Sequence, residues 1–118
     1  MGAVHRRRED GSWEGVDPRA YEGGRRHDII SGPSYRVRYF EVGPGERTRL
    51  EQHPHDHGVV IERGTARVTL GDEQHELGPG DVVYVAPDEL HCFEAIGDEP
   101  LGFICVAPPA VSRAPAGP

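Results

Sequence analysis

The segment 51–57 reads EQHPHDH and holds three of the seven histidines of the sequence. Imidazole and carboxylate groups are the side chains that most readily offer lone pairs to a divalent metal at neutral pH. Short histidine-rich tracts also occur in solvated loops that bind nothing. The segment alone therefore leaves two interpretations open, a metal site and a polar surface loop.

The composition limits the kinds of protein that can carry this segment. With 118 residues there is room for one small domain, and 16 Gly and 11 Pro favour short strands joined by turns. The formal net charge of −7 argues against a nucleic-acid partner, because binding to phosphate backbones depends on Lys and Arg. The sequence has no apolar run long enough for a leader or a membrane span, which predicts a soluble, cytoplasmic protein without a membrane partner.

Runs of β-branched and aromatic residues, separated by Gly, Pro and Asp turns, begin near residue 35. The expected strands, about eight in number, cover 35–42, 46–52, 57–62, 66–70, 74–77, 82–85, 91–96 and 101–106. This spacing is typical of an all-β sandwich or barrel. We therefore expect an irregular N-terminal arm over 1–33, a β-barrel over 34–107 and a flexible Pro/Ala-rich tail over 108–118.

Alternation along the strands predicts which side chains face the core. Because neighbouring side chains in a strand point to opposite faces, His57, Val59 and Ile61 share one face, and Val60 and Glu62 share the other. The first face is the more apolar, so His57 is expected to point inward.

The same argument places Glu51 and His53 on one face of the preceding segment. Pro54 and Asp56 suit a turn, with His55 near its tip.

On these residues the chain resembles a small single-domain cupin of the conserved-barrel type. The first cupin motif reads roughly H-x-H-x₃-E-x₆-G, and aligning it on Gly64 places its other positions at Glu51, His53 and His57. The carboxylate and the first imidazole are exchanged relative to the family pattern. The second motif matches PGDVVYVAPDELH over 79–91, which ends on His91 and has Asp88 where glycine is usual. The resemblance implies a double-stranded β-helix, the jelly-roll barrel of the family.

The resemblance also implies a centre for one divalent transition metal, which could be Fe, Mn, Ni, Co or Zn. Its implied ligands are one carboxylate and three imidazoles: Glu51, His53, His57 and His91. Two alternatives stay open. Glu51 could instead pair with Arg47 or Arg49 and leave an all-histidine site, and His55 could supply an imidazole if the turn is shaped differently.

The implied function is a metal-dependent enzyme acting on a small oxygen-rich or aromatic metabolite, as a dioxygenase or by isomerase, cyclase or lyase chemistry. Tyr84 and His55 are the candidates for a general base. A non-catalytic module that senses a small molecule is the alternative. The resemblance also implies a homodimer. The expected pocket wall is mainly apolar and comprises Tyr39, Val59, Ile61, Phe93 and Phe103.

Overall fold

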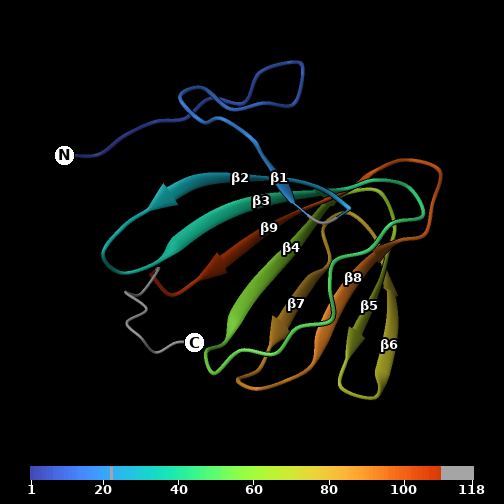
Figure 1. Ribbon diagram of the computed structural model, residues 1–118. Coiled ribbons are helices and arrows are strands. Elements are labelled where there is room, and N and C mark those ends of the chain that lie inside the picture. The colour runs from blue at the N-terminus through green and yellow to red at the C-terminus, as the bar shows by residue number, and fades with distance from the viewer. Residues whose placement is uncertain (22, 110–118) are drawn as a thin grey trace.

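The computed structural model describes residues 1–21 and 23–109 and shows two antiparallel sheets packed face to face (Figure 1). Its strands are β1 (Arg19–Tyr21), β2 (Gly24–Ser31), β3 (Arg36–Val42), β4 (His57–Arg63), β5 (Ala66–Leu70), β6 (Glu73–Leu77), β7 (Val82–Val85), β8 (His91–Ala95) and β9 (Leu101–Ala107). One sheet has the order β1-β2-β3-β9-β4-β7, and the other has the order β6-β5-β8. The predicted all-β fold is confirmed.

The apolar core lies between the two sheets, and β4 shows how the sequence builds it. His57, Val59 and Ile61 are buried on β4, whereas Val60 is exposed and Glu62 is half-buried. The predicted alternation is therefore confirmed, and His57 points into the molecule. Burial of the apolar face, worth roughly 25 cal/mol per Å², favours this register over a one-residue slip, which would turn His57 outward.

Residues 46–52 do not form the strand that was expected there. They run beside β8 and contact it through isolated bridges, Arg47 with Glu94 and Glu51 with His91. Between these bridges the Phe93 N–H donates to the Thr48 hydroxyl at 2.9 Å rather than to a backbone carbonyl. The side-chain acceptor interrupts the ladder, so the segment is held against β8 without becoming a regular strand.

The N-terminal arm is irregular only as far as residue 18, which corrects the expectation for 1–33. β1 and β2 form a hairpin, and β2 pairs with β3 in a register that includes Arg26 with Phe40 and His27 with Tyr39. This hairpin extends the larger sheet beyond β3. It adds a wall to the space between the sheets.

Residues near the N-terminus cover the outer face of β3. The Arg7 guanidinium lies 4.7 Å from the Tyr39 ring centroid and 5.0 Å from that of Trp13, and it also pairs with Glu62. Tyr39 therefore points away from the space between the sheets. Its expected place in the pocket wall is wrong, because the outer face of β3 is covered as well as the inner one.

The C-terminal segment is described only as far as Pro109. The expected flexible tail over 108–118 thus lies mostly outside the described residues. Pro108 is tied to the barrel, since its carbonyl accepts a 2.8 Å hydrogen bond from Arg36 Nε. Cys92 and Cys105 are free and buried, as expected. Over residues 1–21 and 23–109, the structure contains no helix with the length and apolarity to cross a bilayer.

Candidate metal centre

A pair of backbone hydrogen bonds brings the two halves of the candidate site together. The Glu51 N–H donates to the His91 carbonyl at 3.0 Å, and the His91 N–H donates to the Glu51 carbonyl at 2.9 Å. Glu51 lies on the segment leading into the histidine-rich turn, and His91 begins β8. Residues far apart in the sequence are thereby held side by side by main-chain contacts, independently of their side chains.

The side chains of Glu51, His53 and His91 form a group with metal-binding potential. Each offers one donor atom, and the three atoms lie within 4.8 Å of one another. His53 Nε2 is 3.3 Å from Glu51 Oε1. Two imidazole nitrogens and a carboxylate oxygen make up a donor set that suits a divalent transition metal and leaves positions open for other ligands.

A hydrogen bond sets the tautomer of His91. Its Nδ1 lies 2.9 Å from the Glu89 carbonyl oxygen. A carbonyl can only accept, so Nδ1 carries the proton and Nε2 keeps its lone pair. This is the partner that metal-bound histidines usually have behind them, and it orients the ring.

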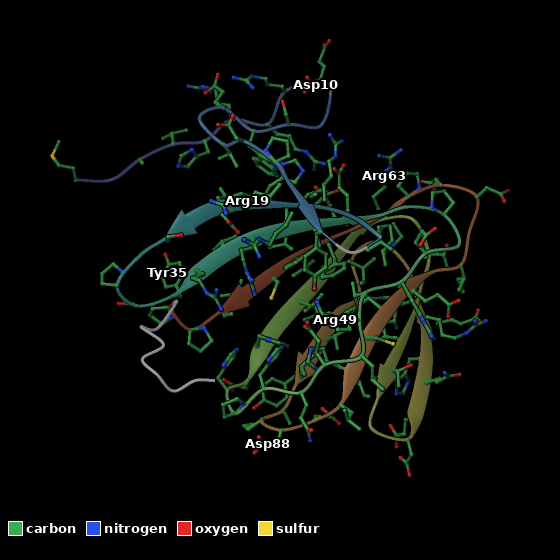
Figure 2. The ribbon with its side chains drawn as sticks, in the orientation of Figure 1. Asp10, Arg19, Tyr35, Arg49, Arg63 and Asp88 are labelled. Atoms are coloured by element: carbon green, nitrogen blue, oxygen red, sulfur yellow. The ribbon has the colours of Figure 1, made fainter. Side chains whose placement is uncertain are left out.

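The turn carrying Asp88 is hydrogen-bonded to the segment that bears His53. Asp88 has φ of 63°, a left-handed conformation that Asp tolerates better than most residues. Its N–H donates to the His53 carbonyl at 2.6 Å, and its own carbonyl accepts from Gln52 Nε2 at 2.7 Å. Figure 2 shows Asp88 at this turn, which joins β7 to β8. Asp88, which replaces the usual glycine of the second motif, thus adopts the conformation that the turn needs and bonds the turn to the His53 carbonyl.

His57 lies beside the three-donor group but is not one of its members. Its ring centroid is 4.9 Å from that of His91 and 5.6 Å from that of His53. Its Nδ1 is buried without a hydrogen-bond partner within the described residues. Burial, together with the neighbouring His91, His55 and His53, lowers the pKa of His57 to about 4. The imidazole is therefore neutral at physiological pH, with a free lone pair.

This depressed pKa predicts that metal-free protein loses stability on acidification. The ordinary pKa is 6.5 and the folded value is about 4, so between them the unfolded state binds the proton and the folded state does not. Stability should fall as the pH drops through this window, at up to about 1.4 kcal/mol per pH unit for this group. Urea denaturation with a chelator, across a pH series, measures the slope. The slope should be shallower in His57→Gln, and equal slopes would contradict the assignment.

The two candidate bases are placed very differently. His55 lines the pocket, and its ring stacks on that of His53 with centroids 5.2 Å apart. Tyr84 is 61% exposed on the outer face of β7, where its hydroxyl donates to Asp56 at 2.8 Å. The structure therefore brings His55 to the candidate site and does not bring Tyr84 there. The run Val82–Val85 is apolar on both faces, so its sequence gave no sign of which side is inward.

The group opens into a cavity of about 310 Å³ between the sheets. Of the apolar wall residues expected from the sequence, Val59, Phe93 and Phe103 line it. Ile61 packs in the core and Tyr39 lies outside, while Phe40 lines the cavity in their place.

Sequence reasoning missed the cavity's charged residues. Arg26 on β2 and both Arg36 and Arg38 on β3 line the cavity, whereas Glu51 is its one acidic lining residue within the described chain. The sequence does contain a sign of them, because Arg36 and Arg38 alternate with Phe40 along one face of β3. The expectation of a mainly apolar wall is thus corrected, since one side of it is strongly basic.

Comparisons with known proteins agree with this architecture. A family model described as "Cupin domain" matches residues 38–107. A 1-methylthio-D-xylulose 5-phosphate methylsulfurylase from Rhodospirillum rubrum is 39% identical over 80% of this chain and 67% of its own length. The mannose-1-phosphate guanylyltransferase ManC of Salmonella typhimurium is 37% identical over 69% of this chain, but the match spans only 17% of that protein.

A solved structure gives the same picture. The cupin 2 conserved barrel domain protein from Rhodopseudomonas palustris superposes with a TM-score of 0.84 at 30% identity, covering 94% of this chain and 83% of that one.

Proposed function

This chain belongs to the cupin family, and we propose that it is a metal-dependent enzyme acting on a small oxygen-rich metabolite. The observation that carries the proposal is the convergence of Glu51, His53 and His91 at a cavity large enough for such a molecule. A divalent metal bound there would supply Lewis-acid chemistry, or dioxygen activation if the metal is iron. The reaction that we propose is either that of a dioxygenase or that of an isomerase, cyclase or lyase.

The chain's own residues have distinct parts in this proposal. Glu51 supplies the one negative charge of the donor set, and the Glu89 carbonyl holds His91 in the tautomer that presents Nε2. His57 is a further neutral imidazole beside the group, with its ring centroid 4.9 Å from that of His91. His55, which faces the cavity, is the residue that we propose for proton transfer. The sugar phosphate in the methylsulfurylase's name supports a substrate rich in oxygen atoms.

Elemental analysis of protein purified without a chelating tag tests the metal centre. Wild type should carry one transition metal at near-stoichiometric level, and Glu51→Ala should carry clearly less. Glu73→Ala is the matched control, because Glu73 is an exposed carboxylate that lies 3.3 Å from His75 Nε2, far along the chain from the three-donor group. Metal-free wild type would overturn the proposal. Full occupancy in Glu51→Ala would instead indicate an all-histidine site that includes His57.

We also propose that the chain forms a homodimer through the outer face of β7. This strand lies at one edge of the larger sheet, and its Val82 is 70% exposed beside the exposed Tyr84. Edge strands with apolar side chains are commonly covered by a partner. Light scattering at micromolar concentration should give twice the monomer mass for wild type and the monomer mass for Val82→Glu. A monomeric wild type would refute the proposal.

A further inference from the structure

Two arginines of β3 that line the cavity differ from six other arginines of the chain in their partners. Arg7, Arg19, Arg25, Arg26, Arg63 and Arg67 each form an ion pair with a carboxylate. Within the described residues, Arg36 and Arg38 have no carboxylate within 4.0 Å. Both of these arginines line the cavity.

The contacts that Arg36 and Arg38 do make leave most of their donors free. Arg36 Nε donates to the Pro108 carbonyl. The Arg38 guanidinium lies 5.1 Å from the Phe40 ring centroid, and its Nη2 donates to Cys105 Sγ at 4.0 Å. Arg38 Nε is buried without a hydrogen-bond partner in the described part of the chain. A guanidinium has five N–H donors. The aromatic contact and the carbonyl therefore hold these side chains in place while leaving N–H groups for a ligand.

Register places these arginines along one side of the cavity. In the register of the sheet, Arg38 lies opposite Asp28 of β2 and Cys105 of β9, and Arg26 of β2 lies opposite Phe40. Arg26 is closely paired with Asp28, Nε to Oδ1 at 2.9 Å. The ion pair with Arg26 neutralises the Asp28 carboxylate. The charges of Arg36 and Arg38 then leave this side of the cavity with a net positive charge. Burial and the neighbouring Arg38 lower the pKa of Arg36.

We propose that Arg36 and Arg38 form a subsite for the phosphate group of a phosphorylated small molecule. Two guanidinium groups match a phosphate dianion in charge, and each offers the forked pair of N–H donors that phosphate oxygens accept. The subsite lies in the same cavity as Glu51, His53 and His91, so a ligand anchored by its phosphate presents its remaining oxygens toward the donor group. This inference deepens the proposed function by naming the substrate class, and it rests on the proposed function for that role.

Calorimetric titration of metal-free protein with inorganic phosphate tests the subsite at low ionic strength. Wild type should bind, Arg36→Gln and Arg38→Gln should each bind at least about tenfold more weakly, and Arg38→Lys should fall between. Arg67→Gln is the matched control, since it removes the same charge from a half-exposed residue of β5 outside the cavity. Circular dichroism establishes that each variant is folded.

Several results would overturn the subsite. These are no phosphate binding by wild type, affinities of the Arg36 and Arg38 variants within twofold of wild type, or an equal loss in Arg67→Gln. Acetate binding as tightly as phosphate would show a carboxylate site and overturn the phosphate assignment. The titration is done with a chelator present, so its result does not depend on whether the protein binds a metal. A protein that binds phosphate but no metal would contradict the proposed function and would still support the phosphate subsite.

Discussion

Replacing His91 by alanine is expected to abolish stoichiometric metal binding. A ring nitrogen of His91 is one of three donor atoms that lie within 4.8 Å of one another, and the Glu89 carbonyl sets the tautomer of the ring. Losing a residue behind a ligand typically costs 10- to 100-fold in metal affinity, so loss of the ligand itself should cost more than about 100-fold. Competition with a chromophoric chelator measures the affinity, and elemental analysis measures the occupancy.

Two histidine variants serve as controls for this result. His75→Ala removes an exposed imidazole whose recorded partner is Glu73, and it should bind metal like wild type. His55→Ala removes a cavity residue outside the three-donor group, so it should also retain metal. The backbone hydrogen bonds between residues 51 and 91 persist in His91→Ala, which should therefore remain folded. Undiminished metal affinity in folded His91→Ala would contradict the site.

Gly64→Ala is expected to lower the free energy of unfolding by at least about 3 kcal/mol. Gly64 has φ of +79°, and a Cβ there would lie 2.4 Å from the Pro100 carbonyl oxygen and 3.1 Å from Leu101 Cα. Both neighbours are backbone atoms at the start of β9, so relief requires β9 to move away from β4. That movement would disturb the pairing of Ile61 with Phe103 in the core. Urea denaturation monitored by circular dichroism measures the change.

Gly45→Ala separates the cost of the left-handed backbone conformation from the cost of the close contact with Pro100. Gly45 has nearly the same φ, +80°, but a Cβ there meets nothing within 4 Å. Only the left-handed conformation is penalised, so the expected loss is about 1–2 kcal/mol. If Gly64→Ala costs no more than Gly45→Ala, the close approach to Pro100 is not what requires glycine at position 64. Thermal denaturation should rank the two variants in the same order.

Alternation was informative wherever one face of a strand is apolar and the other is not. It placed His57, Val59 and Ile61 inward on β4, as the structure confirms. The strands expected at 66–70 and 82–85 have the bounds that the structure shows. On β5, as on β4, burial of one apolar face dominates the energetics, and that preference is readable as a period of two. On β7, which is apolar on both faces, the bounds follow instead from the turn residues on either side of it.

Alternation failed where both faces of a strand are covered or both are polar. On β2, Arg26 lines the cavity and the register places Asp28 on the same face, while Arg25 and His27 share the other face. The strand therefore carries no apolar stripe, and the sequence suggested an irregular arm. On β3, Tyr39 is covered by the N-terminal segment and Phe40 by the core, so the two faces look alike. In a strand that lines a polar pocket, the inward-facing residues are themselves polar, so the sequence pattern does not reveal which face is inward.

The sequence by itself determined the all-β class, the two motifs and the inward face of β4, because each depends on local spacing and on burial of apolar side chains. Only the tertiary structure decided which donors meet. The backbone hydrogen bonds between residues 51 and 91 hold Glu51 and His91 side by side, and His53 joins them in the three-donor group. The pairing of β7 with β4 leaves Tyr84 exposed on the outer face. The tertiary structure also decided that Arg36 and Arg38 face the cavity without carboxylate partners in the described chain. Contacts between residues distant in sequence depend on how the sheets pair, and local spacing carries no record of that pairing.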